Sequence, residues 1–182
     1  MNRLSDAIKG KEVLLVGNSS SIIGAGLGSK IELSEFVIRF NLSIAHLNSC
    51  TGMKTDAWVF AMKREEVCQR IYNNAIIKPD LCVRHDRHPR PELDFNFLPL
   101  DVAISDVQND LRTTLDPSVG VCTLWYVLNC SEPKKVSIVG FDSFSNRNFY
   151  IKKNTLRSQH PVTEEDNYIS KLKSSQKIGF LN

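Results

Sequence analysis

The alternation of short apolar runs with helix-like segments is the feature that most constrains this chain. The runs are rich in branched and aromatic residues and have the length of buried strands. They lie at 12–17, 36–41, 56–62, 80–85 and 135–141. Segments with apolar residues near helical spacing lie at 63–72, 100–115, 121–130 and 162–173. Strands that alternate with helices predict an α/β fold with a mainly parallel sheet flanked by helices.

The length and the charge of the chain limit the classes of protein to which it can belong. A chain of 182 residues suits one domain over 1–182, and its 42% of hydrophobic residues can form a core. The 23 basic and 20 acidic residues leave a net charge of +3, which does not predict a nucleic-acid partner. No run approaches the roughly 18 apolar residues of a membrane span, and the N-terminal segment lacks a signal peptide's apolar core. We therefore expect a cytoplasmic protein with no transmembrane segment.

The five cysteines are scattered through the chain and form no C-x-x-C pair. The spacing therefore predicts neither a disulfide framework nor a cysteine zinc site. Two histidines, His85 and His88, lie in the charged segment 84–99, which holds three prolines and is expected to be an irregular loop. They could bind a metal or an acidic group, but a solvated loop is the preferred interpretation.

Small residues follow the strand at 12–17, as Gly17-Asn18-Ser19-Ser20-Ser21 and then glycines at 24, 26 and 28. Such residues let a ligand approach the backbone, whose N–H groups and hydroxyls can hold a phosphate or a sugar. The spacing matches neither G-x-G-x-x-G nor a P-loop. A loop without a ligand therefore explains the composition equally well.

Two helix starts carry further candidates. Ser118 follows Asp116-Pro117 and can cap the helix at 121–130, while the same N-terminus can present free N–H groups to an anion. His160 precedes Pro161 at the start of the last helix. It is a surface or capping residue, or, as a neutral imidazole, a base.

Several stretches match the motifs of one known family, in the family's order. V-G-N-S-S at 16–20, G-A-G-L-G at 24–28, I-E at 31–32 and V-I-R-F-N at 37–41 fit its large motif without a gap. T-G-M-K-T at 51–55 resembles its G-x-K-T stretch. P-S-V-G at 117–120, followed by Gly140-Phe141, fits the small motif, and His160 with Glu165 fits H-x-x-x-x-E. The chain thus resembles the animal-type sialyltransferases, which transfer sialic acid from CMP-sialic acid.

The chain departs from the family pattern at four points. Val13 stands at the first position of the usual disulfide, and Cys130 lies about one residue from the second. Val119 replaces the usual Ser or Thr of the small motif. The nearest counterpart of the third motif, Asn148-Phe149-Tyr150, has no histidine, and the chain is shorter than typical members. The resemblance is therefore to a short, disulfide-free, cytosolic member of bacterial or viral type.

The resemblance implies a single Rossmann-like domain, the sialyltransferase variant of the GT-A-like fold. It implies an inverting glycosyltransferase that moves sialic acid, or a related keto-acid sugar, from a CMP-sugar donor to a glycan hydroxyl. No metal or other cofactor is implied, because CMP is already a good leaving group. The implied partners are the CMP-sugar and the glycan acceptor, with no nucleic acid.

The resemblance also implies residue roles. Asn18 and Asn41 would hold the nucleotide phosphate and ribose, while Gly140 and Asp142 would lie near the base or ribose. Tyr150 would contact the donor phosphate. The remaining implied residues come from the last two motifs: Ser118, Val119 and Gly120 for the nucleotide, His160 as general base, and Glu165 to orient the last helix.

Two other functions stay open at this stage. One is a degenerate module that binds CMP without turnover, which the short length and the missing histidine favour. The other is an NAD-dependent oxidoreductase, supported only by the glycine-rich loop after the first strand and opposed by its glycine spacing.

Overall fold

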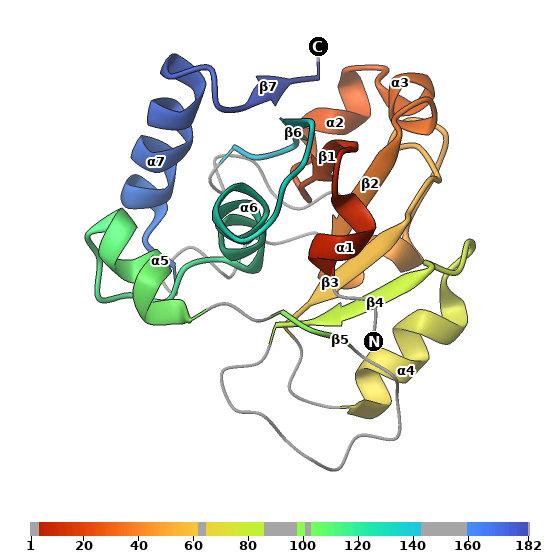
Figure 1. The fold of residues 1–182 in the computed structure, drawn as a ribbon. Coiled ribbons are helices and arrows are strands. Elements are labelled where there is room, and N and C mark those ends of the chain that lie inside the picture. Colours follow the sequence, from red (N-terminus) through yellow and green to blue (C-terminus); the bar gives the residue numbers. More distant parts are fainter. Residues whose placement is uncertain (1–3, 62–64, 86–97, 101–102, 143–159, 182) are drawn as a thin grey trace.

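Among the residues that the structure describes, seven strands form one sheet in which every neighbouring pair is parallel. The computed structural model describes residues 4–61, 65–85, 98–100, 103–142 and 160–181. The strands are β1 (Glu12–Val16), β2 (Phe36–Phe40), β3 (Ala57–Phe60), β4 (Leu81–Arg84), β5 (Leu98–Pro99), β6 (Lys135–Val139) and β7 (Gly179–Phe180). Their order across the sheet is β5-β4-β3-β2-β1-β6-β7 (Figure 1). The predicted Rossmann-like α/β fold is confirmed.

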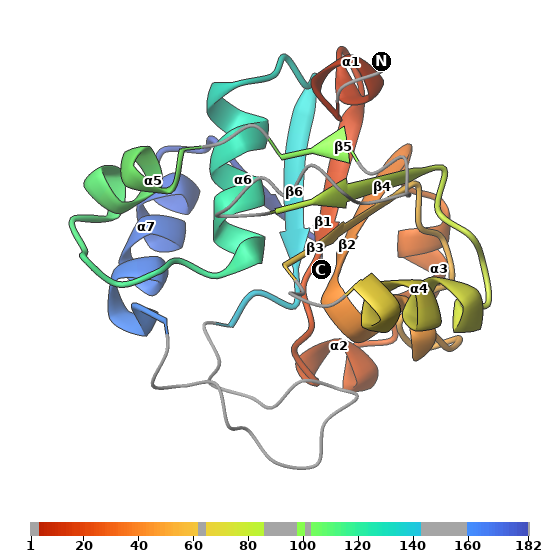
Figure 2. The same ribbon diagram turned by 90° about the horizontal axis from the view of Figure 1, so that it is seen from below.

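Helices cover both faces of this sheet (Figure 2). One face packs against α1 (Leu4–Ile8), α5 (Ile104–Leu111), α6 (Val119–Asn129) and α7 (Val162–Ser174). The other packs against α2 (Ser21–Gly24), α3 (Gly28–Glu32), the 3₁₀ helix η1 (Asn41–Ala45) and α4 (Glu65–Asn74). None of the described helices has the length and apolar character needed to cross a membrane.

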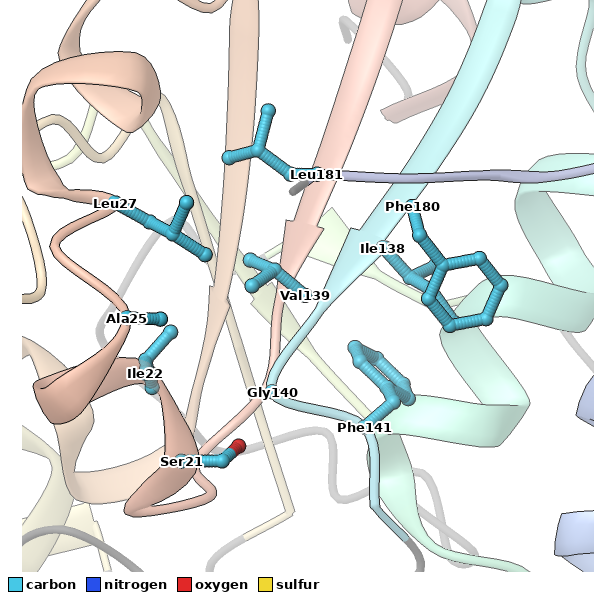
Figure 3. A pocket seen from close by; sticks show the side chains of 10 residues that line it. All are labelled: Ser21, Ile22, Ala25, Leu27, Ile138, Val139, Gly140, Phe141, Phe180 and Leu181. Atoms are coloured by element: carbon cyan, nitrogen blue, oxygen red, sulfur yellow. The ribbon is translucent and has the colours of Figure 1, made fainter.

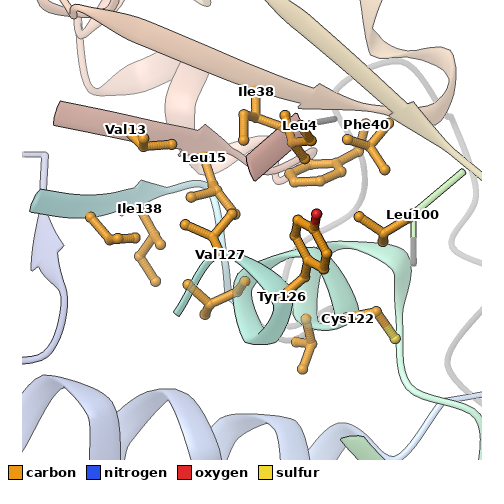
Figure 4. Packing of buried hydrophobic residues seen from close by; sticks show 14 of the residues in the cluster. Leu4, Val13, Leu15, Ile38, Phe40, Leu100, Cys122, Tyr126, Val127 and Ile138 are labelled. Atoms are coloured by element: carbon orange, nitrogen blue, oxygen red, sulfur yellow. The ribbon is translucent and has the colours of Figure 1, made fainter. Parts of the chain in front are cut away.

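The interior strand β1 shows why the sheet is buried on both sides. Val13 and Leu15 join the core under α6, whereas Leu14 and Val16 join the core under α2 and α3. Successive side chains of a strand point to opposite faces, so a run of apolar residues fills both cores. Figure 4 shows Val13 and Leu15 packing with Val127 on the α6 side.

The structure corrects several expected boundaries. The helix expected over 100–115 spans only Ile104–Leu111 in the described part, because Arg112 adopts a left-handed φ of 58° that ends it. The segment 84–99, expected to be an irregular loop, contributes Arg84 to β4 and its last two residues to β5. Arg84 and His85 are buried rather than solvated, and 86–97 lies outside the described residues.

Six short elements of the described chain were not predicted: α1, α2, α3, η1, β5 and β7. Each has five residues or fewer, too few to show a periodic pattern, and helices this short depend on tertiary packing. Two of them, α2 and α3, lie within the glycine- and serine-rich stretch 17–32. That stretch is therefore partly helical rather than one continuous loop.

A buried arginine holds the chain that follows β2. Arg39 lies in β2, is fully buried, and donates from Nε to the carbonyl of Lys54 at 2.9 Å. Its Nη2 donates to the carbonyls of Thr51 and Gly52 at 2.8 and 3.1 Å. Burial lowers the pKa of Arg39 to about 10, so it is still charged at neutral pH. The arginine thus fixes the loop 51–54 beneath the end of β2.

Candidate active site

The neighbouring strands β1 and β6 mark the point where the strand order reverses. In open α/β sheets, ligands bind in the crevice outside the carboxyl ends of strands at such a point. Here β1 continues into Gly17 and β6 into Gly140, and the Gly17 N–H donates to the Val139 carbonyl at 2.7 Å. A Cβ on Gly17 would lie 2.2 Å from the Gly140 oxygen. Only glycine therefore allows these two loops to meet.

A chain of contacts links the loops after β1, β2 and β6 to the start of α6. Asn18 Nδ2 donates to the Phe40 carbonyl at the end of β2, with a separation of 3.4 Å. The Phe40 ring meets the Phe141 ring edge-on, with centroids 5.9 Å apart. The Phe141 ring in turn lies against Gly120, where an added Cβ would be 3.0 Å away. The structure thus brings Asn18, Gly120 and Gly140 to one end of the sheet.

Asn41 directly follows β2 and has a left-handed φ of 50°, a conformation that asparagine tolerates better than most residues. Its side-chain oxygen accepts from the Ala61 N–H at 3.1 Å, and its carbonyl accepts from Trp58 Nε1 at 2.7 Å. The side chain thus joins the ends of β2 and β3. Its amide Nδ2 is the group that can donate to a ligand.

The N-terminus of α6 has two backbone donors to offer. An α-helix leaves its first N–H groups without partners inside the helix. Here Val121 N–H is capped by Ser118 Oγ at 3.3 Å, which confirms the predicted cap, and Cys122 N–H bonds the Ser118 carbonyl at 2.9 Å. Within the described residues, the N–H groups of Val119 and Gly120 have no acceptor. These two groups, at the positive end of the helix, suit an anion.

Glu165 ties α7 to the same helix end. Its side chain is only 2% exposed, and its carboxylate accepts from Ser118 N–H at 2.6 Å and Ser118 Oγ at 3.0 Å. Burial raises the pKa of Glu165, and the hydrogen bonds from Ser118 oppose that shift. Since the Ser118 hydroxyl gives its one proton to Glu165, it can meet a ligand only as an acceptor.

We expect Glu165 to make stability depend on pH. Because the pKa of Glu165 is raised in the folded state, the folded protein binds a proton at this carboxyl group more tightly than the unfolded chain does. Stability therefore falls as the pH rises from about 4.5, the ordinary pKa of glutamate, through the pKa of Glu165 in the folded state. Glu165→Gln keeps the shape and can still accept from Ser118 N–H, but cannot ionise. Urea unfolding between pH 4 and 8 should show this decline in the wild type and not in the variant. Equal declines in both proteins would contradict the assignment.

His160 lies just before α7, half-buried, with its ring against the segment that leads into α6. Its Nδ1 is 2.9 Å from the carbonyl oxygen of Asp116. A carbonyl can only accept, so Nδ1 carries a proton. In the neutral ring the lone pair is then on Nε2. The Asp116 carbonyl therefore selects the tautomer in which Nε2 can accept a proton.

A pocket of about 260 Å³ opens between α2 and the ends of β6 and β7 (Figure 3). Its described lining is apolar apart from the Ser21 hydroxyl. Gly140 and Phe141 form its border toward the strand ends described above. The lining residues are Ser21, Ile22, Ala25, Leu27, Ile138, Val139, Gly140, Phe141, Phe180 and Leu181.

The predicted site residues thus fall into two linked groups. Asn18, Asn41, Gly140 and Asp142 follow the strands β1, β2 and β6. Ser118, Val119, Gly120, His160 and Glu165 gather at the starts of α6 and α7. The Phe141–Gly120 contact joins the groups, while Tyr150 lies outside the described residues.

Sequence reasoning missed two residues of this region. Phe141 was matched only as part of a motif, yet its ring connects Phe40 with Gly120. Ser19 is buried and donates to Asp142, although 123 positions separate them. The run of three serines after β1 drew attention to this loop, but nothing in the sequence pairs Ser19 with the loop after β6.

Comparisons with known proteins give a structural likeness alone. No family model and no curated protein matches the sequence. The fold is similar to a crystal structure of a mammalian sialyltransferase, and to one of a mammalian sialyltransferase in complex with Gal-beta-1-3GalNAc-ortho-nitrophenol. Each has a TM-score of 0.61 and 16% identity, over 94% of this chain and 69% of the other. At this identity the likeness establishes the fold.

Proposed function

We propose that the protein is an inverting glycosyltransferase that moves sialic acid, or a related keto-acid sugar, from a CMP-sugar to a glycan hydroxyl. The observation that carries the proposal is the convergence of the strand-end loops, the α6 N-terminus and His160 at one end of a sialyltransferase-like fold. The proposal treats residues 1–182 as one such domain. It requires no metal ion, since the leaving group is a phosphate monoester of low basicity.

The donor nucleotide is assigned to the crevice between β1 and β6. The N–H groups of Val119 and Gly120 would bind the CMP phosphate and stabilise the negative charge that develops on it as the sugar departs. Asn18 and Asn41 would hold the phosphate and ribose from the opposite side. The apolar pocket beside Gly140 and Phe141 offers a surface for the pyrimidine base.

The acceptor hydroxyl is assigned to the His160 side of the crevice. Nε2 of the neutral ring would take the hydroxyl proton while the oxygen attacks the anomeric carbon. The bond to the phosphate breaks on the opposite face of the sugar, so the configuration inverts through an oxocarbenium-like state. Glu165 does not touch substrate in this scheme; it holds α7, and with it His160, against Ser118.

Transfer from CMP-sialic acid to a panel of glycan acceptors tests the proposal. We expect sugar transfer in a single turnover without added metal, with the product of opposite anomeric configuration. Transfer that is absent with every CMP-sugar would overturn it. CMP binding without any transfer or donor hydrolysis would instead support the non-catalytic binding module.

A further inference from the structure

The loops that follow β1 and β6 are joined by side chains as well as by backbone. Ser19 is 3% exposed, and its N–H donates to the Gly140 carbonyl at 3.3 Å. Its hydroxyl lies 2.5 Å from Asp142 Oδ2, a distance typical of a hydroxyl that donates to a carboxylate. Asp142 follows β6 at the carboxyl end of the sheet and is partly exposed.

The hydrogen-bonding capacity of the Ser19 hydroxyl is fully used. A serine hydroxyl has one proton and two acceptor sites. The proton goes to Asp142, because an ionised carboxylate can only accept. The two acceptor sites receive the Ser21 N–H at 3.0 Å and the Ser21 hydroxyl at 2.8 Å. Ser19 therefore has one orientation, and it fixes Oδ2 of Asp142.

We propose that Ser19, backed by Ser21, positions the Asp142 carboxylate to accept hydrogen bonds from the vicinal hydroxyls of a ribose. An acidic residue near the end of a parallel strand serves ribose hydroxyls in other open α/β sheets. The pocket that Ser21 lines lies next to Gly140, two residues before Asp142, so a base in the pocket brings its ribose to this carboxylate. The site then selects ribonucleotides over 2′-deoxyribonucleotides. The inference rests on the proposed function, from which it takes the position of the nucleotide in the crevice. It does not depend on which base the nucleotide carries.

The ratio of the dissociation constants of 2′-deoxy-CMP and CMP, measured by calorimetry, tests this role. A hydrogen bond to a charged group predicts a ratio of about 10 to 100 in the wild type. We expect Ser19→Ala and Asp142→Asn to bring the ratio to about 1 to 3. The first variant removes the hydroxyl that positions the carboxylate, and the second replaces the carboxylate by an uncharged amide. Ser20→Ala is the matched control: Ser20 is the next serine in the chain, and its side chain makes no capping hydrogen bond. It should keep the wild-type ratio.

The other possible outcomes of this measurement also decide for or against the inference. A merely structural role of Ser19 would weaken both nucleotides equally and leave the ratio unchanged, which would overturn the inference. A wild-type ratio near 1 with tight CMP binding would overturn it while the proposed function stands. If CMP fails to bind but AMP or UMP binds with a ratio that Ser19→Ala abolishes, the inference holds and the proposed function falls. If no ribonucleotide binds, both are wrong.

Discussion

Replacing His160 with alanine is expected to reduce the single-turnover rate of sugar transfer by about 10² to 10⁴, the usual contribution of a general base. The physical reason is that Nε2 is the ring atom left to accept a proton once Nδ1 donates to the Asp116 carbonyl. Affinity for CMP should change little, since the proposed phosphate donors are on α6. Rapid-quench kinetics with CMP-sialic acid, together with calorimetry of CMP, measures both quantities.

His160→Asn separates the base from the structural contact. The asparagine Nδ2 can replace the Nδ1–H donor toward Asp116, so this variant should retain more thermal stability than His160→Ala. It has no nitrogen that can accept a proton, so its transfer rate should be as low as that of the alanine variant. A His160→Asn variant that transfers at the wild-type rate would show that His160 is not the base.

Gly17→Ala is expected to destabilise the protein by about 3 kcal/mol, at the upper end of the usual cost of overpacking. The added Cβ would lie 2.2 Å from the Gly140 oxygen and 2.7 Å from the carbonyl carbon, both of them backbone atoms. Neither can rotate away, so the ends of β1 and β6 must separate and strain the hydrogen bond from Gly17 to Val139. For a chain of this size the change corresponds to a fall in melting temperature of about 6–12 °C.

Gly24→Ala is the matched control for this prediction. Gly24 lies in α2, seven positions further along the chain, and a Cβ added there would meet nothing within 4 Å. Alanine also has the higher helix propensity, so its stability should stay within about 1 kcal/mol of the wild type. Chemical denaturation of both variants provides the comparison. Similar losses in the two variants would mean that the close approach of β1 and β6 is not what requires glycine at position 17.

Much of the fold could be predicted because its causes are local. The buried strands at 12–17 and 36–41 are visible as compact apolar runs, and the helix after Ser118 as apolar residues three and four positions apart. The cap of α6 was also predictable, since the Ser118 hydroxyl accepts a hydrogen bond from the N–H of Val121, only three residues further along the chain. The residues gathered at the candidate site were found through motif resemblance, not through any pattern that places them in space.

The sequence by itself determined the alternation of strands and helices and the residue types available for chemistry. Only the tertiary structure decided that β1 lies between β2 and β6, which sets the crevice at the ends of β1 and β6. It also decided that Glu165 holds Ser118 and that Ser19 holds Asp142, pairs separated by 47 and 123 positions. Propensity and periodicity act over a few residues, whereas such contacts exist only once packing both faces of the sheet has fixed the strand order.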